Sequence, residues 1–147
     1  MAISTPSYVT LISGIVTTLK NDARMDGVPD DFIYYGPDPQ IPKFPAVTVE
    51  LTNSTETWKS FPTNKDSVSN ITIRAFDESL GYVDGLQKVE TMAKNISDTL
   101  QANKTISGLA YQVNFMGKRF SPGTYDNIPI FACEMDMEIK QRFGVST

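Results

Sequence analysis

The segment "FACEMDMEIKQRF" (residues 131–143) decides the fold, because apolar and ionisable side chains alternate along it. Its apolar positions are Phe131, Cys133, Met135, Met137 and Ile139. Ionisable residues fill most of the alternate positions, from Glu134 to Arg142. Successive side chains of a β-strand point to opposite faces of a sheet, so the pattern predicts a strand with one buried face and one polar face.

Two other segments alternate in the same way and predict paired strands. They are "PAVTVELT" (45–52) and "SNITIRAF" (69–76), in which Val, Leu and Ile positions alternate with polar ones. The connection "NSTETWKSFPTNKDSV" (53–68) is long for a hairpin. Either the strands continue into it as an arm, or it is a functional loop.

Two further strands are expected. "FIYY" (32–35) is a short apolar candidate, and "LAYQVNFMGKRF" (109–120) alternates over a greater length. The Pro- and Gly-containing segment "SPGTYDNIP" (121–129) then predicts a turn into the last strand.

Helical periodicity occurs twice. Apolar residues recur at helical spacing from Pro6 to Lys20, where Thr5 is the expected N-cap, and from Gly81 to Leu100, where the signal is strongest. The order of elements predicts an α+β domain spanning residues 1–147. Its mostly antiparallel or mixed sheet would carry both amphipathic helices on one face.

Composition narrows the functional classes. The chain has 147 residues, of which 40% are hydrophobic, and this length suits one folded domain. Thirteen basic and seventeen acidic residues give a net charge of −4 with no basic run, which argues against stable nucleic-acid binding. We expect no membrane span, no signal peptide and residence in a cytoplasm-like compartment.

No cofactor, metal or disulfide is expected. The sequence has no His, and its one cysteine, Cys133, lies on the predicted apolar face, where a thiol is inert and has a raised pKa. Glu134 and Asp136 would lie about 6.6 Å apart along a strand, within the range of paired-carboxylate hydrolases. The alternative, which we favour, is that they form the solvated face of a strand.

Candidate contact residues lie in the two long connections. Trp58 and Phe61 are large aromatics in a polar segment, which indicates either a partner contact or packing on their own domain. Lys118, Arg119 and Tyr125 bring basic and aromatic groups to the last hairpin. They are expected either at a solvated tip or in contact with an acidic neighbouring subunit.

The chain resembles the tail terminator, or tail completion, proteins of long-tailed bacteriophages. The resemblance covers residues 6–143 and rests on the arrangement of helix "YVTLISGIVTTL", strands "FPAVTVEL" and "SNITIRAF", and helix "GYVDGLQKVETMAKNISDTL". The terminal strands "LAYQVNFMGKRF" and "IPIFACEMDMEIKQRF" complete it.

The resemblance implies a structural protein of the virion neck, without catalysis, that is assembled in the host cytoplasm. It would cap the tail tube as a hexameric ring, end tail elongation and bind the head connector, while DNA passes through its centre. A head-side connector, or stopper, subunit is the alternative within the same virion context.

Within such a ring the polar face of the last strand has two possible roles. Glu134, Asp136 and Glu138 would repel DNA if they lined the channel. Alternatively, they would pair with Lys118 and Arg119 of an adjacent subunit or strand.

Overall fold

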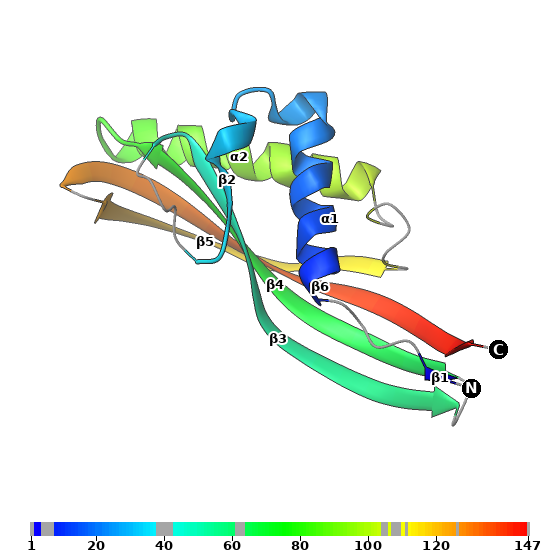
Figure 1. The fold of residues 1–147 in the computed structure, drawn as a ribbon. Helices are drawn as coiled ribbons and strands as arrows, with labels where there is room; N and C mark the ends of the chain where they lie inside the picture. Colours follow the sequence, from blue (N-terminus) through cyan, green and yellow to red (C-terminus); the bar gives the residue numbers. More distant parts are fainter. Residues whose placement is uncertain are drawn as a thin grey trace.

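The computed structural model describes residues 2–3, 8–37, 43–60, 64–103, 106, 110, 112–125 and 127–146. Within these residues, six strands form one sheet and two α-helices lie on one of its faces (Figure 1). The sheet is mixed and mostly antiparallel, and both helices pack on it, which confirms the predicted α+β class.

The helices are α1 (Tyr8–Asn21) and α2 (Tyr82–Ala102), with short 3₁₀ turns η1 (Ala23–Met25) and η2 (Asp30–Phe32). The strands are β1 (Ala2–Ile3), β2 (Ile33–Tyr35), β3 (Ala46–Ser60), β4 (Asn64–Glu78), β5 (Gln112–Tyr125) and β6 (Ile128–Ser146). They are ordered β1-β6-β4-β3-β2, and β5 also pairs with β6. Among the described strands, β2 and β3 pair in parallel and the other pairs are antiparallel.

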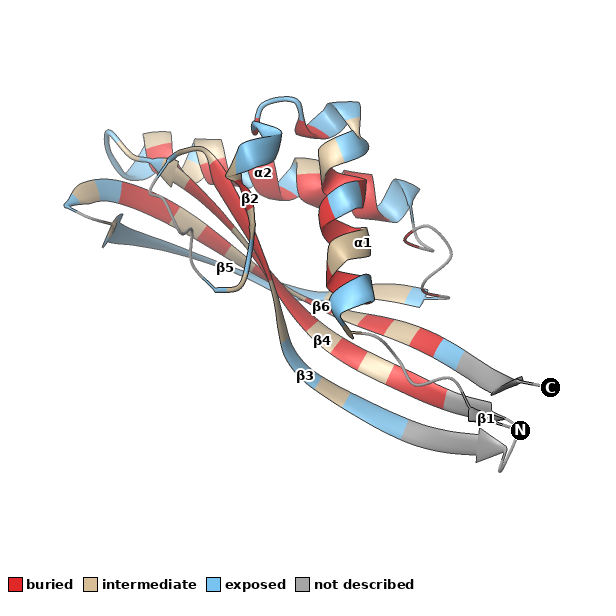
Figure 2. Ribbon diagram, in the orientation of Figure 1, coloured by how far each residue is buried: buried red, intermediate tan, exposed pale blue. Residues whose placement is uncertain are grey.

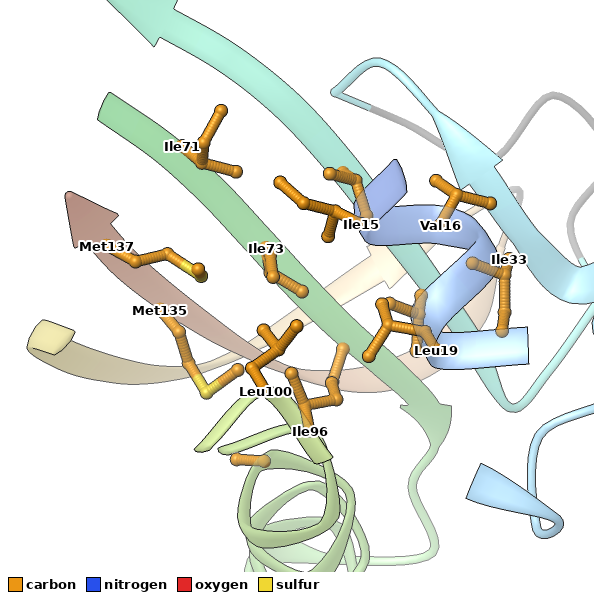
Figure 3. Close-up of a cluster of buried hydrophobic side chains, with 14 of the residues drawn as sticks. Ile15, Val16, Leu19, Ile33, Ile71, Ile73, Ile96, Leu100, Met135 and Met137 are labelled. Carbon is orange, nitrogen blue, oxygen red and sulfur yellow. The ribbon is translucent and has the colours of Figure 1, made fainter. Parts of the chain in front are cut away.

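The core lies between the helices and one face of the sheet. The five apolar positions of the opening segment are all buried, each at most 1% exposed. Buried residues on β4 and on the inner sides of both helices meet them (Figure 2). Around Ile73 of β4 lie Leu19 of α1 and Leu100 of α2 (Figure 3). The alternation in β6 therefore arises, as predicted from the sequence, because one face of the strand is buried in the core and the other is polar.

Both helices occur where the periodicity places them. The first ends at Asn21 rather than Lys20, and its predicted start at Pro6 lies outside the described residues. The second runs two residues beyond its predicted end at Leu100. Its buried residues include Val89, Ile96 and Leu100, as the spacing requires.

The long connection between the two central strands is an arm. β3 and β4 remain paired as far as Ser60 and Asn64, with register shifts after Leu51 and after Trp58. In Figure 1 this end of the sheet extends well beyond the helices. The functional-loop alternative is therefore wrong, because most of the segment is β-strand.

The predicted turn at 121–129 is also mostly wrong. β5 begins at Gln112 and continues to Tyr125, and its Pro122 lies opposite Phe131 of β6. Proline is accommodated here because β5 is an edge strand: among the described residues, no strand pairs with its outer side. The chain reverses near Asn127, which adopts the left-handed conformation at φ 65°.

Close packing at Gly85 gives a test of the core. A Cβ added there would lie 2.7 Å from the Cβ of Phe131 and 2.6 Å from the Oγ of Ser79. Overpacking typically costs about 1–3 kcal/mol, and the higher helix propensity of alanine offsets about 1 kcal/mol of that. We expect Gly85→Ala to lower the free energy of unfolding by up to about 2 kcal/mol in urea titrations followed by circular dichroism.

The matched control is Gly27→Ala, because a Cβ there meets nothing within 4 Å. That variant should stay within about 0.5 kcal/mol of wild type. Equal stability of the two variants would contradict the predicted close contact between α2 and β6.

Candidate functional site

Charged side chains form a cross-strand cluster on the sheet face opposite the helices. The register places Arg74 of β4 opposite Glu134 of β6, and Glu134 opposite Arg119 of β5. The Arg74 Nη1 donates to Oε2 of Glu50 at 2.6 Å, and its Nε donates to Oε1 of Glu134 at 3.1 Å. We call Glu50, Arg74, Arg119, Glu134 and Asp136 the charged ladder.

Arg119 joins the two carboxylates of β6. Its Nη2 donates to Oε2 of Glu134 at 2.6 Å, and its Nη1 donates to Oδ2 of Asp136 at 2.7 Å. The hydroxyl of Thr72 donates to the other oxygen of Asp136 at 3.0 Å. Both acids of the ladder on β6 are therefore held by donors from the two neighbouring strands.

Glu138 continues the row with weaker contacts. Nζ of Lys140 lies 3.7 Å from its Oε1, and the amide of Asn114 donates to the same oxygen at 3.5 Å. Farther along the arm, Nε of Arg142 donates to Oδ1 of the buried Asp66 at 3.0 Å. The polar face thus consists of paired rather than isolated charges, most of them between strands.

These contacts lower the pKa values of both ladder acids on β6. For Glu134 the chief cause is the hydrogen bond from Arg119, with Arg74 adding to it. For Asp136, burial raises the pKa, but the donors Arg119 and Thr72 outweigh it and the net direction is downward. Burial lowers the pKa of Arg74, yet its two carboxylate partners raise it overall. Near neutral pH Glu134, Asp136 and Arg74 are therefore ionised.

An ionised ladder does not suit the paired-carboxylate hydrolase alternative. Such an enzyme needs one carboxyl with a raised pKa that donates a proton to the leaving group. Glu134 and Asp136 both shift the other way. Their side chains lie on an open strand face, 34% and 36% exposed. The geometry supports structural ion pairs rather than acid catalysis.

The other predicted contact residues lie in different surroundings. Lys118 is opposite Met135, so it points to the helix side of the sheet, away from Arg119. The ring of Tyr125 packs edge to face on Phe44, with centroids 6.1 Å apart. Trp58 belongs to β3, but its side chain lies outside the described residues, as does the whole of Phe61. Their roles at subunit or partner interfaces stay predictions.

The pairing of Arg119 with Glu134 and Asp136 occurs between strands of one chain. Three carboxylates and two guanidinium groups leave the charged ladder with one net negative charge. Most of the negative potential of these acids is therefore cancelled locally. A channel-lining role for Glu134, Asp136 and Glu138 stays a prediction.

Arg74 and Glu50 are ladder members that sequence reasoning did not single out. The alternation placed both on polar positions of their strands, which was the available signal. Their partnership with Glu134 depends on the relative register of three strands. Sequence alternation cannot supply that register.

Other possible sites are few in the part of the chain that the structure describes. No group of three or more Cys, Asp or Glu side chains there is arranged to hold a metal ion. No helix among these residues is both long and apolar enough to cross a bilayer. Cys133 is fully buried, and burial raises its pKa to about 11, as its position in the sequence predicted.

Comparison with known proteins identified a structural neighbour. No protein-family model matched the sequence, and no curated protein matched it either. The fold is similar to that of a chain in a solved structure described as "Virion of native gene transfer agent (GTA) particle". The TM-score is 0.59 at 13% identity, and the match covers 92% of this chain and 99% of the other. At this identity the likeness establishes a shared fold.

The lowered pKa values predict a particular dependence of stability on pH. Unfolded Asp and Glu have pKa values of about 3.9 and 4.3, so the ladder stabilises the fold above about pH 4. This contribution is lost as the pH falls through the lower folded-state values of Glu134 and Asp136. Arg119→Gln removes a shared donor. It should lower the urea midpoint at pH 6, and the difference from wild type should shrink towards pH 2.

Lys118→Gln is the control, because it removes a neighbouring positive charge on the opposite face of β5. Its difference from wild type should change little between pH 6 and pH 2. A constant difference for Arg119→Gln over the same range would show that the ladder does not shift these carboxyls.

Proposed function

We propose that this chain is a structural subunit of a tailed, phage-like virion and that it acts as the tail terminator. Copies would form a ring, six in the simplest case, on the last layer of the tail tube. The ring would end tube elongation, provide the docking surface for the head connector and let DNA pass through its centre. Its place would be the neck of the virion.

The observation that carries the proposal is the extent of the structural match. It includes 92% of this chain and 99% of the virion chain, so the two share a whole subunit and not only a common hairpin. A shared fold does not by itself imply a shared function. The proposal therefore also depends on what the surfaces of this chain can do.

Two features of the surface support an assembly role. The carboxylates best placed for chemistry are held as ion pairs by Arg74 and Arg119, which orders the strand face that the helices leave open. Beyond the helices, β3, β4 and β6 form a long arm that can reach a neighbouring molecule (Figure 1). Long strands with exposed edges can pair with a strand of another copy, and such a contact can repeat around a ring.

Deletion of the gene from the producing phage or particle tests the proposal. A terminator stops the growth of the tube, so we expect unjoined DNA-filled heads and tubes that exceed the normal length. Negative-stain electron microscopy would measure both. Expression of the intact gene from a plasmid is the control and should restore joined particles with normal tails.

Two other outcomes would contradict the terminator role. Unjoined tubes of normal length would indicate a head-side connector instead. Joined particles with normal tails would show that the chain is dispensable for the neck.

A further inference from the structure

β3 has an open edge where β2 ends. β2 pairs with β3 only at Val47, Thr48 and Val49, and the last contact there is the donation from the Gly36 amide to the Val49 carbonyl at 2.9 Å. From residue 50 to residue 56, no strand among the described residues lies on this side of β3. Unpaired backbone groups along such an edge are a template for another strand.

An apolar groove lies beside this open edge. Its volume is about 340 Å³, and it lies between the first turns of α1 and the end of β2. It is lined by Tyr8, Val9, Ile12, Tyr35, Gly36, Val49, Glu50 and Leu51. Val9 is 78% exposed and Tyr35 is 52% exposed, so large apolar surface remains uncovered in the single chain.

The opposite edge of the sheet has complementary properties. β5 exposes the apolar side chains of Met116 and Phe120, and its charged residues are Lys118 and Arg119. It contains no acidic residue. The described side chains of β3 include two carboxylates, Glu50 and Glu56, and no cation. Arg119 and Glu50 pair within the charged ladder, so the difference in charge between the two edges rests on Lys118 and Glu56.

Strand direction makes the two edges compatible. The antiparallel pairs from β3 through β4 and β6 to β5 make β5 run antiparallel to β3. A second copy placed beside the first in the same orientation would therefore bring its β5 antiparallel to the open edge. Repetition of such a head-to-tail contact closes a ring when the rotation between copies allows it.

We propose that β5 of one copy pairs with the edge of β3 beyond Val49 in the next copy, an inference that rests on the proposed ring. The Phe120 ring enters the apolar groove, and Lys118 binds Glu56. Phe120 and Lys118 share the helix side of β5, because they lie opposite the buried Cys133 and Met135.

Leu51 and Glu56 occupy the same side of β3, since they lie opposite the buried Ile71 and Ser67. Because the strands run antiparallel and β3 has one extra residue at its register shift, Phe120 beside Leu51 places Lys118 opposite Ser54. Glu56 is then the diagonal neighbour on the same side, within reach of a long side chain. Glu56 already accepts a hydrogen bond from Tyr8 at 2.7 Å, and a carboxylate has acceptor sites for more than one donor.

Two features limit the length of the new pairing. Towards the start of β5, the register shift between Phe115 and Gly117 disrupts the regular strand. Towards its end, Pro122 has no amide hydrogen to donate. Pairing is therefore confined to residues 117–121. A short backbone ladder joined to one aromatic anchor and one ion pair makes an interface that subunits can form reversibly.

A mixing experiment tests the two edges separately. Phe120→Asp disables β5 and leaves the groove intact, whereas Val9→Asp disables the groove and leaves β5 intact. Each variant alone should weaken self-association at least tenfold relative to wild type in sedimentation at concentrations up to about 1 mM. An equimolar mixture retains one good interface per pair, so it should form dimers and no larger species.

Val83→Asp is a matched control. Val83 and Val9 are both the second residue of a helix and are exposed, at 64% and 78%. The control should assemble as wild type does, and circular dichroism should show that all three variants are folded. Lys118→Glu should also weaken association, and combining it with Glu56→Lys in the same chain should restore it.

Three results would overturn the inference: a wild-type chain that stays monomeric up to about 1 mM, variants that assemble normally, or a mixture that forms no dimer. The first two leave the tail terminator role standing if gene deletion still gives overlong tubes. Normal tails after gene deletion would instead remove the proposed function, whatever the sedimentation shows.

Discussion

The pairing of β6 with strands on both sides is the constraint on which the rest of the structure depends. β6 pairs with β4 along one edge and with β5 and β1 along the other. One set of its alternate residues supplies the floor of the core, and the other set supplies two acids of the charged ladder. A shift of one residue would exchange these faces, so both depend on the same register.

The charged ladder and the core support each other across the sheet. Each guanidinium of Arg74 and Arg119 contacts two carboxylates, and Glu134 is shared between them. Ion pairs on open surfaces contribute little individually. Their value here is that they connect four neighbouring strands in one register on the face that the helices do not cover. The ion pairs thus hold the side chains of the polar face in place, although no helix packs on that face in the described structure.

The proposed ring would use the parts of the sheet that one chain leaves incomplete. β2 covers only the first part of the edge of β3, and β5 is exposed along its outer side. In a monomer such edges favour uncontrolled association, and natural proteins limit this with bulges, proline and charged residues. β5 has all three of these features, and they restrict any partner strand to a short segment.

The sequence by itself determined the fold class, both helices and the buried face of β6. These features follow from local periodicity, because a period of two or of 3.6 residues assigns each side chain to a face before any partner is known. The same reasoning placed Glu134 and Asp136 on a polar face and Cys133 in the core. It left open whether β3 and β4 continue as an arm, because a polar segment without strong alternation is also typical of a loop.

Only the tertiary structure decided which charges meet. Arg74, Arg119 and Glu134 are far apart in the chain, and their contact depends on the register of three strands. The continuation of β5 through Pro122 likewise depends on its pairing with β6, which overrides the local turn signal. Non-local backbone pairing sets these features, and no periodicity within a single segment encodes its partner.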